Sequence, residues 1–345
     1  MTPSKSASDI LARMPKTELH LHLEGTVGPE TLWELAATHG VTLPAPTLEE
    51  LRKLYEFTSF DMFLTLWLAM HSCFKDAAAY ELMVDRYVAE CRRQNIRYVE
   101  AHFTPFNHEQ GGLGGRGALD VVSKRLRAAE AAGGPITRLI LDISTVSLPE
   151  GGEYTAELLE SLADPIVVAI GLGGPEVGFP RKDSASYFRR ATQAGYAAVA
   201  HAGETFGAVS VREAIEDLNV RRVQHGIRAV EEPTVLALLA QRQICCDVAL
   251  TSNTLLTEYR SLADHPLKTM LAAGVPVTLG TDDPAFFNTD LVREYTLAHE
   301  EVGLPLEELW QLNLNGLRFG LAAVPLRRRL MMEFQEAWRT LSAQR

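Results

Sequence analysis

Short apolar stretches rich in valine, isoleucine and leucine recur along the whole chain, with helix-like segments between them. The strand-like stretches cover residues 17–23, 96–104, 136–144, 166–172, 196–201, 221–225, 244–250 and 275–281. Most of them lack polar alternation, which indicates parallel strands covered on both faces. Apolar residues recur at helical spacing in residues 80–93, 117–132, 184–194, 211–218, 232–242 and 266–273. Alternating strands and helices predict βαβ units.

Eight such units predict an α/β fold of the (β/α)8 TIM-barrel class, with the active site at the C-terminal ends of the strands. The first connection, residues 26–95, is far longer than the others. We expect a helical insertion there, which serves either as a lid over the site or as extra packing at the barrel rim. Extra helices should follow the eighth strand. No linker or repeat divides the chain, so residues 1–345 are expected to form one domain.

Composition narrows the classes of partner. The chain is 46% apolar and 22% charged, as in ordinary globular proteins, and its net charge of −11 lacks the basic footprint of a nucleic-acid binder. No window reaches the roughly 18 apolar residues that a membrane helix requires. The four cysteines form no C-x-x-C pair and no signal peptide is recognisable, so we expect reduced thiols and a cytoplasmic location. The oligomeric state is left open, a homo-oligomer included.

Candidate metal ligands stand at the ends of several predicted strands. His20 and His22 are two residues apart in the first strand, so both side chains point to the same face. His201 closes the fifth strand and Asp282 follows the eighth. Two histidines alone would be explained as buried core residues, but three imidazoles with one carboxylate suit a single Zn²⁺ that keeps a position for water. A buried aspartate is costly unless it is paired or bound to metal.

Further titratable residues follow these ligands. Glu204 comes three residues after His201, and a carboxyl group in a closed pocket has a raised pKa and can act as a general acid. The alternative for Glu204 is a carboxylate that stabilises a helix N-terminus. Asp283 follows Asp282 and would meet the substrate, or else cap the turn before Pro284.

Four segments resemble the adenosine deaminase family of the metal-dependent amidohydrolase superfamily. They are MPKTELHLHLEG at 14–25, HAGE at 201–204, QHG at 224–226 and GTDDP at 280–284, in the family's order. The resemblance implies a (β/α)8 barrel that removes the 6-amino group of a purine by hydrolysis and releases ammonia. No P-C-x-x-C motif is present, which excludes the cytidine-type zinc deaminases.

The resemblance also implies a role for each site residue. One zinc ion per chain would be held by His20, His22, His201 and Asp282. Glu204 would protonate the purine nitrogen N1, and His225 would orient and deprotonate the attacking water. Asp283 would bond N7, and the backbone N–H of Gly174 would meet N3.

The substrate is less clearly indicated. LEGT at 23–26 and ADHPL at 263–267 resemble the adenine deaminases, whereas GLGGPE at 171–176 and FTSFDMF at 57–63 resemble the branch acting on aminodeoxyfutalosine. That nucleoside carries a benzoate-type extension at its 5′ end. Glu24 stands where adenosine deaminases usually have aspartate, near the ribose 5′ end. We therefore expect Glu24, Phe57, Phe60 and Phe63 to contact the substrate.

These features rank aminodeoxyfutalosine slightly ahead of adenosine, with free adenine as the alternative. A catalytically inactive relative that binds purine nucleosides is disfavoured, because it would be expected to lack Glu204, His225 or a metal ligand. A barrel hydrolase that cleaves amides or phosphoesters is disfavoured as well, since no lysine stands at the fourth strand end to bridge two metal ions.

Overall fold

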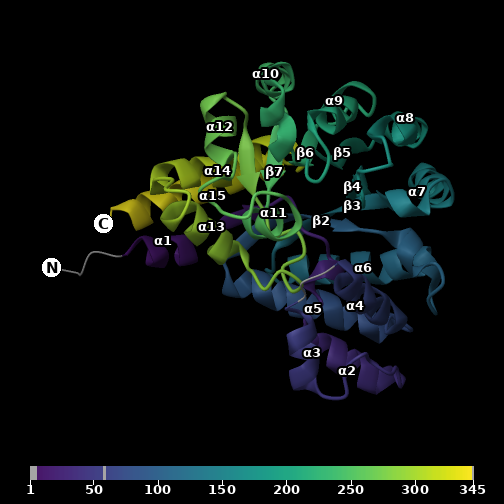
Figure 1. Ribbon diagram of the computed structural model, residues 1–345. Helices are drawn as coiled ribbons and strands as arrows, with labels where there is room; N and C mark the ends of the chain where they lie inside the picture. Colours follow the sequence, from purple (N-terminus) through teal and green to yellow (C-terminus); the bar gives the residue numbers. More distant parts are fainter. Residues whose placement is uncertain (1–5, 57–59, 344–345) are drawn as a thin grey trace.

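A closed ring of eight parallel strands forms the centre of the protein (Figure 1). The computed structural model describes residues 6–56 and 60–343, with the backbone alone for residues 60–64. In order around the ring, the strands are β1 (Lys16–Glu18), β2 (Ile96–Phe103), β3 (Ile136–Ser144), β4 (Val167–Gly173), β5 (Ala197–Ala202), β6 (Arg222–His225), β7 (Cys245–Val248) and β8 (Val277–Leu279). The predicted (β/α)8 barrel is confirmed.

Helices cover the outside of the ring and connect successive strands. They are α1 (Ala7–Arg13), α2 (Pro29–His39), α3 (Leu48–Leu54), α4 (Phe60–Ser72), α5 (Ala77–Arg93), α6 (Gly114–Ala131), α7 (Glu150–Ser161), α8 (Ala185–Gln193), α9 (Ala208–Glu216), α10 (Pro233–Arg242), α11 (Leu250–Leu256), α12 (Leu267–Ala272), α13 (Leu291–Glu300), α14 (Leu306–Phe319) and α15 (Val324–Ser342). None of the helices described has the length and hydropathy to cross a bilayer. The four cysteines are buried and unpaired, as expected.

The first strand is shorter than its apolar pattern predicts. The regular ladder stops at Glu18, and the chain then pairs irregularly with both neighbours. The carbonyl of His20 accepts the N–H of Asp282 at 3.1 Å, and the N–H of His22 donates to the carbonyl of Asp282 at 2.8 Å. On the other side, the N–H of His102 donates to the carbonyl of Leu21 at 2.7 Å. These bonds close the barrel where the histidines project inward.

The long first connection contains α2, α3 and α4 before α5 returns the chain to β2. In Figure 1, α2 and α3 project away from the strands at the lower edge. Of the expected 26–95 insertion, α5 is the ordinary barrel helix between the first two strands, since it packs on β2. The added part is therefore confined to the segment before α5. Three helices, α13, α14 and α15, follow β8, as predicted. Of these, α14 packs on β8 and β1 and completes the last unit of the barrel.

The interior of the barrel is layered. Ile140, Ala169 and Val199 form a small apolar cluster separate from the main core. Arg222 is fully buried, and its guanidinium contacts Glu100 at 2.7 Å and Asp247 at 2.8 Å. Buried charges are tolerated only when they are paired in this way. The next inward positions towards the C-terminal strand ends carry the histidine cluster.

Candidate metal centre and active site

Four side chains converge on one point. Two come from the segment after β1, one from β5 and one from the turn after β8. The Nε2 atom of His201 lies 3.2 Å from that of His20 and 3.1 Å from that of His22. The Oδ1 atom of Asp282 lies 3.4 Å from His20 Nε2 and 3.3 Å from His22 Nε2. Ligand atoms that share one ion through bonds of about 2.0–2.1 Å lie about 3–4 Å apart, also in a five-coordinate site that keeps a position for water. The spacing therefore fits one metal ion at the centre of the four predicted ligands, which form a candidate cluster.

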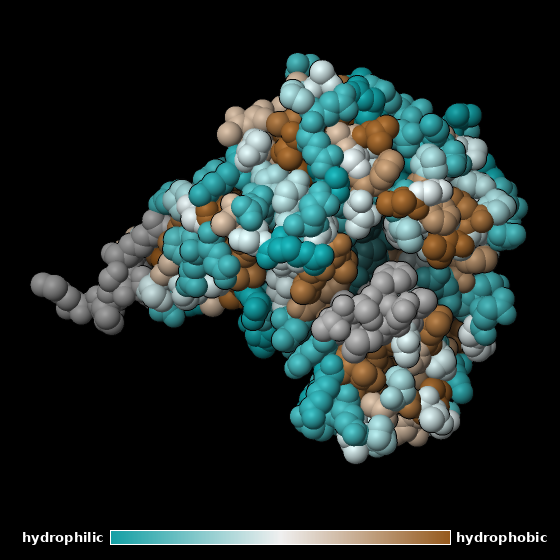
Figure 2. Space-filling model, in the orientation of Figure 1, coloured by the Kyte–Doolittle hydropathy of each residue, from teal (hydrophilic) through white to brown (hydrophobic). Residues whose placement is uncertain are grey.

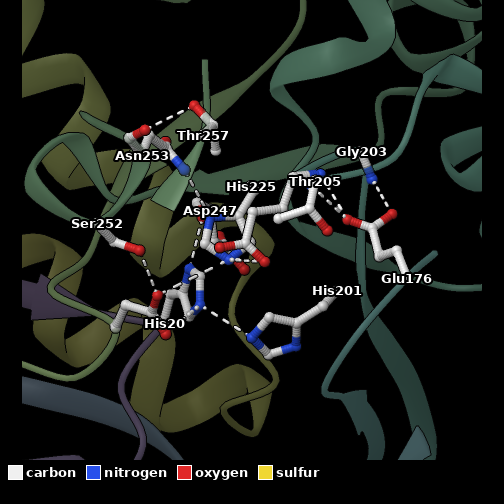
Figure 3. Close-up of polar contacts among 12 residues, drawn as sticks. His20, Glu176, His201, Gly203, Thr205, His225, Asp247, Ser252, Asn253 and Thr257 are labelled. Atoms are coloured by element: carbon white, nitrogen blue, oxygen red, sulfur yellow. Dashed lines mark hydrogen bonds and ion pairs between the residues drawn. The ribbon is translucent and has the colours of Figure 1, made fainter. Parts of the chain in front are cut away.

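Hydrogen bonds to backbone carbonyls orient two of the imidazoles, His20 and His201. Figure 3 shows His20 next to Asp247. His20 Nδ1 lies 2.7 Å from the carbonyl of Asp247, and His201 Nδ1 lies 2.9 Å from the carbonyl of Leu172. A carbonyl only accepts, so each Nδ1 carries the proton and each Nε2 directs a lone pair at the centre. Burial lowers the pKa of His201 well below its usual range, which keeps the ring neutral, as metal binding requires.

Asp282 is oriented from the opposite side. Its Oδ2 atom accepts a hydrogen bond of 2.6 Å from the hydroxyl of Ser252, which leaves Oδ1 facing the histidines. The backbone of Asp282 lies in the left-handed region with φ 63°, at the turn where the chain leaves β8. Ser252 was not singled out from the sequence. Its place next to Asp282 depends on α11 folding back over the barrel mouth.

Two inward-facing residues of β2 and β3 lie beside His22 and were also missed. His102 Nδ1 bonds Asp142 Oδ1 at 2.9 Å, and the other carboxylate oxygen lies 3.7 Å from His22 Nδ1. The close approach of Asp142 to β4 requires Gly171, where a Cβ atom would come within 1.8 Å of the carboxylate. The sequence signal that could have identified His102 and Asp142 is a polar residue at an inward-facing position of an otherwise apolar strand.

Glu204 stands on a tight turn after β5. Gly203 has φ 67°, and the carboxylate of Glu176 accepts the backbone N–H groups of Gly203 at 2.8 Å, Glu204 at 2.7 Å and Thr205 at 2.9 Å. Helix α9 begins only at Ala208, so Glu204 is not a helix N-terminal carboxylate. Burial raises the pKa of Glu204 well above its usual range, and the nearby carboxylates raise it further. The raised pKa favours the protonated form of the carboxyl, as a general acid requires.

His225 ends β6 and lies beside the metal cluster, not within it. Its Nε2 atom is 3.6 Å from Glu204 Oε2 and 3.9 Å from Asp282 Oδ2. Its backbone has φ 62°, which turns the side chain towards the barrel mouth. The ring is fully buried, and its Nε2 atom has no hydrogen-bond partner among the residues described.

Asp283 lies against the turn at Gly25. A Cβ atom on Gly25 would come within 2.0 Å of Asp283 Oδ1, so glycine is needed there. That oxygen has no hydrogen-bond partner within the described part of the chain, so the side chain does not use it to cap the turn before Pro284. Burial raises the pKa of Asp283, with His22 opposing the shift.

The residues expected to contact the substrate are not members of the four-residue cluster. Glu24 is buried, and its Oε1 atom accepts the backbone N–H of Thr104 at 2.9 Å and lies 3.4 Å from His108 Nε2. Although burial opposes it, these contacts lower the pKa of Glu24, and its Oε2 atom has no partner among the described residues. Gly174 is exposed at the end of β4 with φ 88°.

The side chains of the three phenylalanines expected to contact the substrate are not among those described. Phe57 lies outside the described residues. Phe60 and Phe63 belong to the part of α4 for which only the backbone is described. Their contact with substrate stays a prediction.

Comparison with known proteins decides the family. Residues 15–337 match the adenosine deaminase family profile. The chain belongs to the adenosine deaminase family. This adenosine deaminase family member is therefore a hydrolase that acts on a C–N bond of a cyclic amidine.

Its relatives within the family act on different purines. It is similar to an aminodeoxyfutalosine deaminase of Acidothermus cellulolyticus, at 38% identity over 86% of this chain and 85% of that one. It is also similar to an adenine deaminase of Bordetella parapertussis, at 34% identity over 91% and 99% of the two chains. The crystal structure of an adenine deaminase from Arthrobacter aurescens superposes with a TM-score of 0.88 at 32% identity, covering 94% of this chain and 98% of that one.

Proposed function

We propose that the protein is a zinc-dependent deaminase that converts a 6-aminopurine nucleoside, aminodeoxyfutalosine before adenosine, to its 6-oxo product and ammonia. The observation that supports it best is the convergence of His20, His22, His201 and Asp282, whose ligand atoms all lie within 4.8 Å of one another, with Glu204 and His225 beside them. Three imidazole nitrogens and one carboxylate oxygen are a donor set that suits Zn²⁺. The three imidazoles and Asp282 would hold one ion per chain.

The residues around the ion have distinct tasks. When bound, the ion acidifies a water molecule so that it attacks C6 at neutral pH. Glu204 donates its proton to N1 as C6 becomes tetrahedral, which is what its raised pKa prepares it to do. His225 orients the attacking oxygen. N7 and N3 of a purine only accept hydrogen bonds, so a protonated Asp283 donates to N7 and the N–H of Gly174 donates to N3.

The mouth of the barrel supports a substrate longer than adenosine. Large apolar side chains stand exposed on the segments that follow the strand ends, including Leu68 of α4, Val177 after β4, Phe206 after β5 and Leu255 of α11. Figure 2 shows apolar side chains around a hollow on this face. We propose that they meet the 5′ extension of the nucleoside, together with Phe57, Phe60 and Phe63, and that the helices before α5 act as a lid within one single-domain protein.

We propose that Glu24 lies between the purine base and this rim when substrate is bound. Its Oε1 atom is occupied by Thr104 and His108, so its charged Oε2 atom is left to accept a hydroxyl of the ribose. Four buried, unpaired thiols agree with the reducing cytoplasm, where we place the enzyme.

Steady-state rates of ammonia release on aminodeoxyfutalosine, adenosine and free adenine test the proposal. We expect the highest kcat/KM on aminodeoxyfutalosine and a lower value on adenosine. Metal analysis of the purified protein should give one zinc ion per chain. A clear preference for free adenine would overturn the nucleoside assignment and establish the second candidate.

That second candidate, an adenine deaminase, is favoured by one observation of its own. The adenine deaminase structure of Arthrobacter aurescens covers 94% of this chain at 32% identity. Its test is the same comparison of substrates, with phosphate-free buffers and matched metal loading so that only the substrate differs.

A further inference from the structure

A chain of three hydrogen bonds reaches His225 from the side opposite the metal cluster. The backbone N–H of Leu267 lies 3.2 Å from His265 Nδ1, and His265 Nε2 lies 3.2 Å from Asn253 Oδ1. Asn253 Nδ2 then lies 2.9 Å from His225 Nδ1, a contact drawn in Figure 3. All three side chains are buried, so water does not replace these partners. The three residues come from three separate segments: the end of β6, helix α11 and the loop before α12.

The direction of each bond follows from its first member. A backbone N–H only donates, so His265 Nδ1 must accept and the ring proton must lie on Nε2. Burial lowers the pKa of His265 to about 4, so the ring stays neutral and has only this one proton. Its Nε2–H group donates to Asn253 Oδ1, and a flipped amide would place N–H against N–H. The amide nitrogen of Asn253 therefore donates to His225 Nδ1.

Only one neutral tautomer of His225 is compatible with these hydrogen bonds. Its Nδ1 lone pair is occupied, so its proton lies on Nε2. That Nε2–H group points into the space bounded by Glu204 Oε2 at 3.6 Å and Asp282 Oδ2 at 3.9 Å, where it has no partner among the described residues. An N–H group in that place can donate a hydrogen bond to the oxygen atom of a water molecule held next to the metal ligands.

We propose that His265 and Asn253 are positioning residues that hold His225 in the Nε2–H tautomer, so that His225 donates a hydrogen bond to the attacking oxygen. The inference rests on the proposed deaminase function. It differs from the expectation that His225 deprotonates the water, which stays a prediction, because a ring nitrogen that already carries a proton does not accept another without becoming charged.

In this proposal, Glu204 donates and accepts the protons that move during the reaction. After Glu204 has donated its proton to N1, its carboxylate accepts a proton from the attacking water and passes it to the departing amine. The C6–N bond breaks with release of ammonia, and the proton given to N1 stays on the 6-oxo product. As C6 becomes a carbonyl, the remaining proton of the attacking oxygen returns to the Glu204 carboxylate, which restores the acid. His225 neither gains nor loses a proton in this sequence.

The tautomer is measured directly on the zinc-loaded protein labelled with [¹⁵N]histidine. Two-bond ¹H–¹⁵N spectra distinguish a protonated from an unprotonated ring nitrogen, and loss of signals in His225→Gln assigns the ring. We expect wild-type His225 to show a protonated Nε2 and an unprotonated Nδ1. The opposite pattern in the wild-type protein would overturn the proposal without any activity measurement.

The variant Asn253→Asp reverses the direction of the hydrogen bond between residue 253 and His225. A carboxylate only accepts, so it keeps the bond from His265 and draws a proton onto His225 Nδ1. We expect Nδ1 to become protonated and kcat to fall by about 10²–10⁴-fold, because a wrong histidine tautomer has cost about 10⁴ in a serine protease. KM should change by less than about threefold, since Asn253 bonds His225 and not the substrate. An unprotonated Nδ1 in this variant would contradict the proposal.

A matched control lies on the same segment. Thr257→Val removes a hydroxyl that bonds the backbone carbonyl of Asn253 at 2.6 Å but leaves the amide side chain alone, so the tautomer should not change. His265→Leu should let both tautomers appear, and His265→Gln, whose amide again donates, should restore the wild-type pattern. These variants decide the question even where Asn253→Asp fails to fold. Absence of ammonia from every 6-aminopurine would instead overturn the proposed function and leave the spectra unchanged.

Discussion

The carboxylate of Glu176 accepts the backbone N–H of Glu204 at 2.7 Å and is almost completely buried behind it. Together with its bonds to Gly203 and Thr205, this contact fixes the turn from which Glu204 reaches the active site. It also places a second negative charge near Glu204, which is one of the causes that raise the pKa of the Glu204 carboxyl. Glu176 thus fixes the position of the proposed acid and contributes to its raised pKa.

Substitution Glu176→Gln should alter the pH dependence of the reaction. The active form has Glu204 protonated, so kcat/KM is present below the raised pKa of Glu204 and is lost as pH rises through it. Removing the charge of Glu176 lowers that pKa, and the high-pH decline should move to lower pH. The amide also turns one N–H towards a backbone N–H, which should reduce kcat by about tenfold or more. Profiles of kcat/KM against pH measure both effects.

The control for this variant is Glu213→Gln. Glu213 is a partly buried glutamate that accepts the backbone N–H of Arg181 at 2.9 Å, and it is not among the groups that shift Glu204. Its profile should keep the wild-type position. A high-pH decline that does not move in Glu176→Gln would show that Glu204 does not control it.

Substitution Glu204→Gln should remove the proton that N1 needs and leave the metal ligands in place. General acid catalysis of this kind is worth about 10²–10⁴-fold, so kcat should fall by that factor. The zinc content should stay at the wild-type level, because Glu204 is not one of the four proposed ligands. Turnover close to wild type would exclude Glu204 as the acid.

Substitution Ser252→Ala should weaken metal binding. Without the 2.6 Å hydrogen bond to Asp282 Oδ2, the carboxylate loses the contact that directs its other oxygen to the cluster. Loss of such an orienting partner typically lowers metal affinity by about 10–100-fold. Competition with a chromophoric chelator measures the affinity. Thr254→Ala is the matched control, since that hydroxyl bonds the carbonyl of Thr251 on the same helix, and equal affinities in the two variants would contradict the prediction.

Removal of the metal should abolish deamination and lower the melting temperature. Binding to the folded state alone stabilises it by about 4 kcal/mol at a thousand times the dissociation constant. Chelation should therefore lower Tm, and added Zn²⁺ should restore both Tm and activity. In the double variant His20→Ala, His22→Ala, the chelator should leave Tm unchanged. Full activity in the chelated wild-type protein would exclude a metal-dependent reaction.

The sequence by itself determined the barrel and most of the candidate site residues that the structure brings together at its mouth, because those signals are local. A run of apolar residues marks a strand, and two-residue spacing puts His20 and His22 on one face. The end of a strand then tells which side chains reach the mouth of the barrel. The predicted length of the first strand was wrong because its apolar pattern continues past Glu18, where pairing becomes irregular around His20 and His22.

Only the tertiary structure decided what surrounds those groups. Glu176 meets the backbone of Glu204 across 28 positions of the chain, and Asp142 approaches His22 from β3. His265 acts on His225 only through Asn253, with no pattern in the sequence that joins the three. A hydrogen bond depends on distances of a few tenths of an ångström between segments packed by the whole fold. Such distances have no local signature, so these partners became visible only once the barrel was closed.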